Sequence, residues 1–378
     1  MPKKSFFKNR RFNFNEQFLH WKNNWRNGVL RLVERVLSGR NISDLLGGNL
    51  IQVLHLRENQ AQISRMSLIE PGEILNFRAK IGIGSESELI VEEVIQPQYE
   101  IILSNLRADV RSGLLQLESG FIIDSTLAHW QRLLYRGGLT HSVTKLSKSP
   151  EQVSGLWTVL PFSDYYFHTL IEDLPQVIRA CRRNPGLKIL TTTDNPKWTF
   201  ELLNLFNIAY QTTQSRNVRV EEYAAITAPR GISHSTVNLL REKSEVGLDC
   251  LSSRILVARG DSTSRADPSL EDHLAEALAN FGFERVDPSE MSIQEQVRMF
   301  STAKVIVGLH GGGLSNMVWS PVGCKVIEIF NHPYRTLDFA RLSLASGHVY
   351  QSLDISEDDL ASIDIQKFIS EIKTLLIN

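Results

Sequence analysis

The sequence contains little cysteine and no long hydrophobic run. Its three cysteines, Cys181, Cys250 and Cys324, lie far apart and form no CxxC or Cys/His cluster, so neither a disulfide framework nor a zinc site is predicted. No apolar run approaches the roughly 20 residues that span a bilayer, and the N-terminus lacks the uninterrupted apolar segment of a signal peptide. We therefore expect a cytoplasmic protein.

The chain also lacks an excess of charge of one sign. It carries 41 Lys and Arg against 42 Asp and Glu, a formal net charge of −1, so no whole-molecule field favours a nucleic acid or a strongly acidic partner. Apolar residues make up 42% and charged residues 22%, as in soluble globular proteins with a normal core. A length of 378 residues exceeds what one core usually supports, which predicts two domains.

Positive charge is nevertheless concentrated in residues 1–40, which hold ten Lys and Arg and two acidic residues. Apolar and aromatic residues between positions 18 and 37 have helical spacing, so residues 1–48 are predicted to be a basic amphipathic segment. Two interpretations stay open. The helix either packs on the domain with its basic face in water, or makes peripheral contact with an anionic membrane through residues 1–40.

Beyond this segment the chain is of the α/β class. Residues 49–245 are predicted as an N-terminal domain that is β-hairpin-rich over 49–126 and alternates helices and strands over 150–245. Residues 246–355 contain the apolar strands RILVA, FERV, KVIVGL and KVIEIF, separated by helices, which predicts a parallel sheet in a Rossmann-like domain. Residues 356–378 are predicted as a C-terminal helix.

The segment HGGGLSN stands where the buried strand KVIVGL ends and a helix begins. Ligands bind beyond the carboxyl ends of parallel strands, and a helix N-terminus presents free N–H groups to an anion, so a diphosphate fits this position. Three glycines permit close backbone approach and positive φ angles. The alternative is a tight turn without a ligand. The candidate residues are His310, Gly311, Gly312, Gly313, Ser315 and Asn316.

Arg259 and Arg265 lie in the loop after RILVA, again at the carboxyl end of a strand. Guanidinium groups bind phosphate oxygens in pairs and can neutralise a nucleotide leaving group. Glu328 in KVIEIF could accept hydrogen bonds from ribose hydroxyls, as the acid of a dinucleotide-binding unit does. Surface arginines and a structural ion pair for Glu328 are the alternatives.

A second group of candidates lies in DYYFHTLIEDLP. On a helix His168 and Glu172 share a face and Asp173 points about a quarter turn away, so one of them could take the proton of an acceptor hydroxyl. The alternative is an ion pair that steadies the helix. No DxD-type pair follows a strand, so a divalent-metal site is not predicted, and the leaving-group charge would be balanced by arginine and backbone amides.

Together, YYFHTLIEDLP, the loop with Arg259 and Arg265, SIQEQVRMFSTAKVIVGLHGGGLSNMVWSP and KVIEIF resemble glycosyltransferase family 61, in particular its bacterial branch found among capsular and surface-polysaccharide genes. The resemblance implies a GT-B-like fold of two facing Rossmann-type domains, an inverting reaction and a UDP-sugar donor. It places Arg259, Arg265 and the HGGGLSN residues at the donor. It makes Glu172 the first choice for the base, with His168 or Asp173 in reserve.

The sequence thus predicts an inverting glycosyltransferase of bacterial surface polysaccharide biosynthesis. A sugar would pass from a nucleotide donor, UDP by the resemblance, to a hydroxyl of a saccharide or lipid-linked saccharide. The nucleotide sugar is a co-substrate, so no cofactor is expected. Two alternatives stay open: a polysaccharide-modifying transferase of the pyruvyl type, and a non-catalytic subunit that binds a nucleotide sugar or a glycan.

Overall fold

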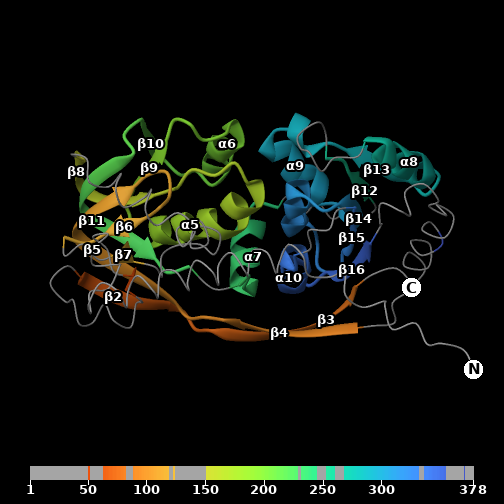
Figure 1. Cartoon of the computed structure of the whole chain (residues 1–378), viewed down its shortest axis with the longest axis horizontal. Helices are drawn as coiled ribbons and strands as arrows, with labels where there is room; N and C mark the ends of the chain where they lie inside the picture. The colour runs from red at the N-terminus through yellow and green to blue at the C-terminus, as the bar shows by residue number, and fades with distance from the viewer. Residues whose placement is uncertain are drawn as a thin grey trace, which may run out of the picture.

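A computed structural model describes residues 50–51, 63–81, 88–118, 122–123, 150–228, 231–244, 253–259, 268–331, 336–354 and 370. They form two α/β halves side by side along the longest axis of the molecule, each built on one sheet (Figure 1). Within the described part of the chain, no helix is both long and apolar enough to cross a bilayer. The predicted segments 1–48 and 356–378 lie outside the described residues, apart from Ser370.

The N-terminal half has a mixed sheet of nine strands in the order β1-β7-β6-β5-β11-β8-β9-β10, with β2 paired to β5. Strands β11, β8, β9 and β10 run parallel to one another, whereas β5 is antiparallel to β11. The strands are β1 (Leu50–Ile51), β2 (Ile63–Glu70), β5 (Gln98–Asp109), β6 (Leu115–Gln116), β7 (Ile122–Ile123), β8 (Glu151–Val159), β9 (Lys188–Thr192), β10 (Tyr210–Thr213) and β11 (Asn217–Ile226). The helices are η2 (His168–Asp173), α5 (Leu174–Arg183), α6 (Lys197–Leu205) and α7 (His234–Arg241).

The C-terminal half has a seven-stranded sheet in the order β13-β12-β14-β15-β16-β3-β4, in which only the β3–β4 pair is antiparallel. Its strands are β3 (Glu73–Ile81), β4 (Glu88–Ile95), β12 (Ser253–Val257), β13 (Phe283–Val286), β14 (Ala303–Leu309), β15 (Lys325–Phe330) and β16 (Val349–Asp354). The helices are α8 (Pro268–Ala279), η3 (Pro288–Glu290), α9 (Ile293–Phe300), η4 (Gly312–Trp319) and α10 (Asp338–Ala345). The predicted strands RILVA, FERV, KVIVGL and KVIEIF are confirmed as parallel neighbours.

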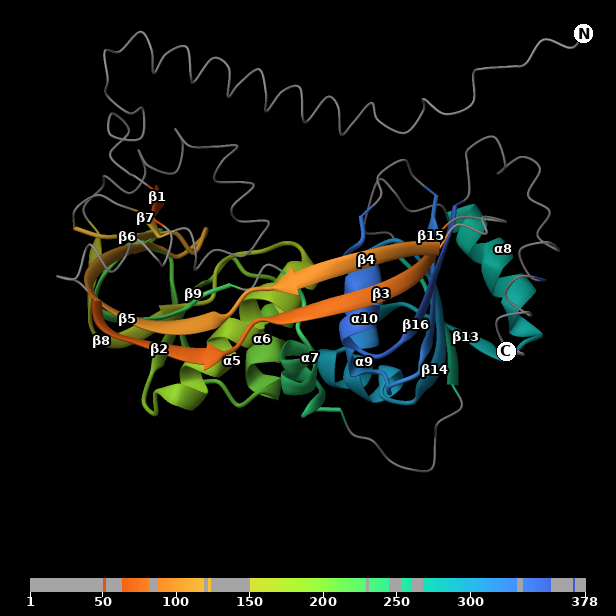
Figure 2. The ribbon, with the colours of Figure 1, turned by 90° about the horizontal axis from the view of Figure 1, so that it is seen from below.

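One hairpin belongs to both halves. Strands β3 and β4 extend from β2 and β5 across to the C-terminal half, where β3 pairs with β16 (Figure 2). Gly72 lies between β2 and β3, and a Cβ there would come within 2.7 Å of the carbonyl oxygen of Ile95, the last residue of β4. The sequence analysis assigned all of residues 49–126 to the N-terminal domain, whereas the structure gives β3 and β4 to the C-terminal sheet.

Helices of the two halves share one hydrophobic core. Val177 and Leu240 of the N-terminal half belong to the same buried cluster as Val297, Trp319 and Leu342 of the C-terminal half. Helix α9 begins at the predicted capping box, in which the Ser292 side chain and Glu295 cap each other's backbone amides. On the other face of the C-terminal sheet, α8 packs in a separate cluster. The shared core therefore holds η4 and α9 against α5 and α7.

Candidate active site

The order in which the chain adds strands to the C-terminal sheet reverses between β12 and β14. From β12 the chain crosses to β13 on one side, and from β14 it continues to β15 and β16 on the other. This order is that of a doubly wound sheet, in which ligands bind in the crevice at the carboxyl ends of the two strands where the direction changes. Arg259 follows β12 and His310 follows β14, so the structure brings these two predicted residues to that point.

Arg259 packs against the glycine loop. Its Nη1 donates a hydrogen bond to the carbonyl oxygen of His310, and a Cβ built on Gly311 would lie 3.0 Å from its Cζ and Nη1. Its backbone N–H donates to Oε1 of Glu271 at 3.0 Å, a carboxyl whose pKa burial raises. A positive charge is therefore held directly against Gly311.

The glycine loop is shaped by close packing and not by positive φ angles, so that part of the sequence prediction is wrong. Gly311 has an extended φ of 171°, and neither Gly312 nor Gly313 has a positive φ. A Cβ on Gly313 would lie 3.0 Å from Cγ1 of Val257, whereas one on Gly312 would have only Tyr166 Cβ near it, at 3.7 Å. Gly312 begins η4, a 3₁₀ helix of eight residues whose first amides face its N-terminal end.

Asn316 and Ser315, predicted to contact the ligand, are instead completely buried. The Asn316 amide donates to Gln296 Oε1 at 2.7 Å, while its Oδ1 accepts from Trp319 Nε1 at 3.1 Å and from Tyr166 at 3.0 Å. Ser315 Oγ has no hydrogen-bond partner among the described residues and is closed off from solvent. Both residues therefore lie on the side of η4 that packs into the core. The hydrogen bonds of Asn316 therefore hold η4 in place.

Glu328 is also not placed as a ribose ligand. Its side chain is fully buried, with Oε1 hydrogen-bonded to His310 Nδ1 and Oε2 accepting from the Tyr350 hydroxyl. Burial raises the pKa of Glu328, and the hydrogen bonds from His310 and Tyr350 act in the opposite direction. His310 stacks on Phe330 with ring centroids 5.1 Å apart. Tyr350 was not predicted from the sequence, which offers no motif around it.

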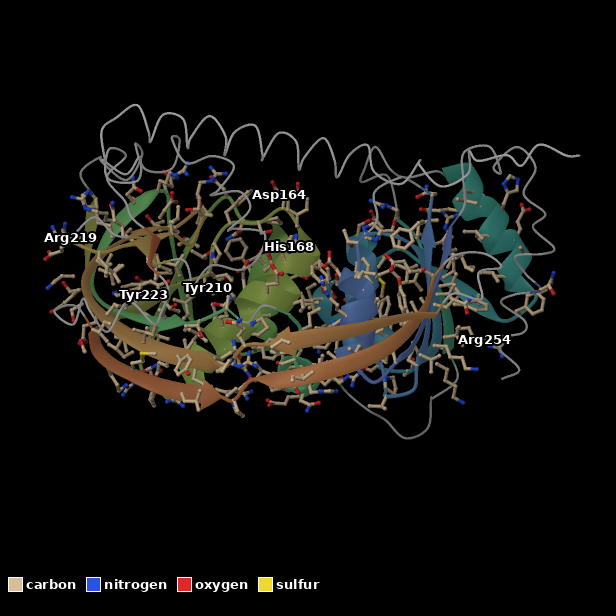
Figure 3. The ribbon with its side chains drawn as sticks, turned by 60° about the horizontal axis from the view of Figure 1, so that its bottom comes forward. Asp164, His168, Tyr210, Arg219, Tyr223 and Arg254 are labelled. Carbon is tan, nitrogen blue, oxygen red and sulfur yellow. The ribbon has the colours of Figure 1, made fainter. Side chains whose placement is uncertain are left out.

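The second group of candidates lies at the start of the helix that continues into α5 (Figure 3). Residues His168–Asp173 form a π-helix, a local widening that is frequent at functional sites. His168 Nδ1 and Glu172 Oε2 are 3.0 Å apart, and both side chains keep about a quarter of their surface exposed. Asp173 instead is buried and lines a small cavity with Thr158 and Tyr223 of the N-terminal sheet. The structure thus separates Asp173 from the other two.

The two groups of candidates are connected through aromatic side chains. Tyr166 donates from its hydroxyl to Asn316 of η4 at 3.0 Å. Phe167 meets Phe339 edge-on at 5.4 Å, and Phe339 meets the His310 ring at the same distance. The residues that directly precede His168 therefore contact the elements that carry the glycine loop.

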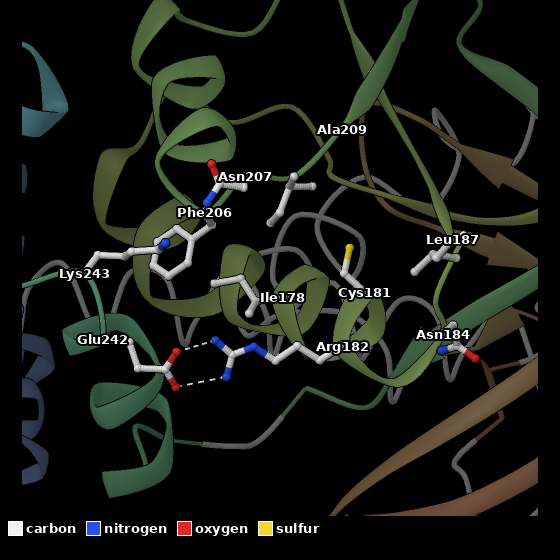
Figure 4. Close-up of a pocket in the computed structure, with 12 residues that line it drawn as sticks. Ile178, Cys181, Arg182, Asn184, Leu187, Phe206, Asn207, Ala209, Glu242 and Lys243 are labelled. Carbon is white, nitrogen blue, oxygen red and sulfur yellow. Dashed lines mark hydrogen bonds and ion pairs between the residues drawn. The ribbon is translucent and has the colours of Figure 1, made fainter.

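Two further features complete the description. Arg265 lies outside the described residues, so its position stays a prediction. A cavity of about 350 Å³ opens between α5, the end of α6 and the end of α7, bordered by the Arg182–Glu242 ion pair and Lys243 (Figure 4). None of its lining residues belongs to the predicted site.

Fold and site together define a doubly wound α/β unit with a cationic site at a glycine loop, and a histidine–glutamate pair that begins two residues after Tyr166, which donates to Asn316 of η4. Residues 166–327 match the family model Glycosyltransferase 61. A stretch of 67 residues, 18% of this chain, is 33% identical to Beta-1,2-xylosyltransferase RCN11 of Oryza sativa subsp. japonica and covers 13% of that protein. The family match begins two residues before His168 and ends one residue before Glu328. These similarities support a family 61 glycosyltransferase.

Proposed function

We propose that this chain is an inverting glycosyltransferase that moves a sugar from a UDP-linked donor to a saccharide hydroxyl, in the setting of bacterial surface polysaccharide synthesis. The observation that carries the proposal is the Arg259 guanidinium on Gly311 at the crevice between β12 and β14. Arg259 supplies a cation and η4 supplies amide donors, and both suit a diphosphate. The two similarities to glycosyltransferases support the same reaction class.

The donor would be held without a metal ion. In this arrangement the diphosphate lies over Gly311 and Gly312, with its oxygens accepting from Arg259 and from the first amides of η4. Because Arg259 is fixed by its contacts to His310 and Glu271, little reorganisation accompanies the charge that develops on the leaving group.

The acceptor would be activated by Glu172. Its carboxylate takes the proton of the acceptor hydroxyl while that oxygen forms a bond to the anomeric carbon. The bond from this carbon to the diphosphate oxygen breaks in the same step, and the nucleoside diphosphate leaves, so the configuration is inverted. His168, 3.0 Å from Glu172, orients the carboxylate. Asp173 is not assigned to this step because it is buried against the sheet.

The test is transfer from a panel of UDP-hexoses and UDP-pentoses, the latter because the rice relative is named a xylosyltransferase. Arg259→Ala should lower kcat about 10²-fold to 10³-fold, the usual loss for one donor to a developing charge. Glu172→Gln should abolish transfer and leave UDP binding intact.

Two variants serve as matched controls. Arg254→Ala removes a guanidinium from the opposite end of β12, where it donates to the Phe281 carbonyl, and Glu276→Gln neutralises an exposed acid of α8. Both should keep wild-type turnover. Near-normal turnover of Arg259→Ala or Glu172→Gln would reject the role given to that residue, and UDP binding without any transfer would favour a non-catalytic binding subunit.

A further inference from the structure

Glu328 and Tyr350 are polar side chains behind His310 that the mechanism above does not use. Glu328 lies on β15 and Tyr350 on β16, and β15 pairs with β14, the strand that ends directly before His310. Glu328 Oε1 faces His310 Nδ1 and Oε2 accepts from the Tyr350 hydroxyl at 2.5 Å, while the His310 side chain keeps 14% of its surface exposed. The side chains of Tyr350, Glu328 and His310 thus form one hydrogen-bonded chain that ends at the glycine loop.

We propose that Glu328 and Tyr350 are positioning residues that keep His310 as an Nε2–H donor to the diphosphate. The inference rests on the proposed function and deepens it at the same site. It gives the two residues a role that acts through His310, since Glu328 is fully buried and the Tyr350 hydroxyl is hydrogen-bonded to it.

Counting the protons of the pair gives the physical reason. Burial raises the pKa of Glu328, so a histidine–glutamate pair with a net negative charge is disfavoured. A neutral pair holds either an imidazolium beside a carboxylate, or a neutral ring that accepts on Nδ1 from a protonated carboxyl. In both arrangements Nε2 carries a hydrogen, because Nδ1 is occupied by the contact to Glu328. Nε2 is then a donor wherever the shared proton lies.

The charged groups around the histidine–glutamate pair determine the pH at which it loses this proton. Asp338 of α10 also raises the pKa of Glu328 and lies 3.7 Å from Arg341, while the Tyr350 hydroxyl lowers it. On the loop side the charged neighbour is Arg259, at the His310 carbonyl, and Phe330 and Phe339 form uncharged walls. When the pair releases this proton, Nε2 becomes an acceptor, and the attraction for the diphosphate decreases.

The experiment is calorimetric titration of the full chain with UDP at several pH values from about pH 6 to about pH 9, which shows at which pH the affinity begins to fall. Glu328→Gln should bind UDP about tenfold to 100-fold more weakly, the range for a hydrogen bond to a charged group. Its amide carries no negative charge to stabilise the second proton of the pair, so the decrease in affinity should set in at lower pH than in wild type. Tyr350→Phe should shift that decrease to higher pH, because the carboxylate loses a donor.

The control is Tyr223→Phe, which removes a buried tyrosine hydroxyl from the N-terminal sheet, where it accepts from the Val159 amide. It should retain the affinity and pH profile of wild type. Equal UDP affinity and equal pH profiles for wild type, Glu328→Gln and Tyr350→Phe would overturn the inference. Failure of wild type to bind UDP would instead count against the proposed function. Should Glu328→Gln not fold, a pH-independent wild-type affinity would overturn the inference alone.

Discussion

Replacing Gly311 with alanine tests whether the position of Arg259 controls the donor site. The new Cβ would lie 3.0 Å from Cζ and Nη1 of Arg259 and 3.3 Å from its Nε, inside the separation of about 3.5 Å at which such atoms attract. The φ of Gly311 is 171°, extended backbone that any residue adopts, so the substitution adds no backbone strain. Any effect of Gly311→Ala on the donor site therefore comes from displacement of the Arg259 guanidinium.

The expected size follows from the contacts that Arg259 must give up. Restoring a normal separation requires the guanidinium to move by about 0.5 Å, which weakens its hydrogen bond to the His310 carbonyl. That loss should cost about 1 kcal/mol of unfolding free energy. A misplaced cation should cost the donor complex about 1.5–3 kcal/mol, which lowers kcat/KM about tenfold to 100-fold.

A double-mutant cycle measures this coupling. Steady-state kcat/KM for the donor is determined for wild type, Gly311→Ala, Arg259→Ala and the double variant. Once Arg259 is removed, the alanine has space, so adding Gly311→Ala to Arg259→Ala should change kcat/KM little. Strictly additive losses, or wild-type kcat/KM in Gly311→Ala, would refute the reasoning that the glycine exists to accommodate Arg259.

Two further predictions concern the junction of the halves. Arg241 of α7 donates to the Val318 carbonyl at the end of η4 and to His348, both at 2.9 Å. Arg241→Met should therefore lower the unfolding free energy by about 2 kcal/mol in urea titrations. An unchanged urea midpoint would contradict this expectation. Burial, with Arg241 nearby, lowers the pKa of His348 to about 3, against about 6.5 when unfolded. Between these two pKa values the folded state binds fewer protons than the unfolded state. The contribution of neutral His348 to the unfolding free energy is therefore complete above about pH 6.5. It falls with decreasing pH by up to about 1.4 kcal/mol per unit, until about pH 3. Urea midpoints of His348→Gln should fall less steeply below about pH 6.5 than those of wild type, and equal slopes would exclude His348 as the cause.

Much of the C-terminal half was predictable because its signals are local. The run VIVGL is apolar and fully buried, as a strand covered on both faces must be, and Ser292 with Glu295 forms the capping box that begins α9. The position of Arg259 and His310 after parallel strands also followed from the sequence, because such strand ends meet at one edge of the sheet.

Long-range pairing was not predictable in the same way. Strand β3 pairs with β16 about 270 residues later in the chain, and no local pattern in either strand specifies that partner. The choice between the open alternatives for Glu328 and Asn316 was not predictable for a related reason: a sequence shows a polar residue near a strand or helix end, but burial decides which neighbouring groups it meets.

The sequence by itself determined the α/β class, the order of the C-terminal strands and helices, and the two groups of candidates around His168 and His310. These depend on periodicity, capping and glycine content, which act over a few residues. Only the tertiary structure decided that Arg259 lies on Gly311, that Glu328 and Tyr350 stand behind His310, and that Asp173 faces away. Such contacts join strands distant in the chain, and the packing of one shared core fixes them.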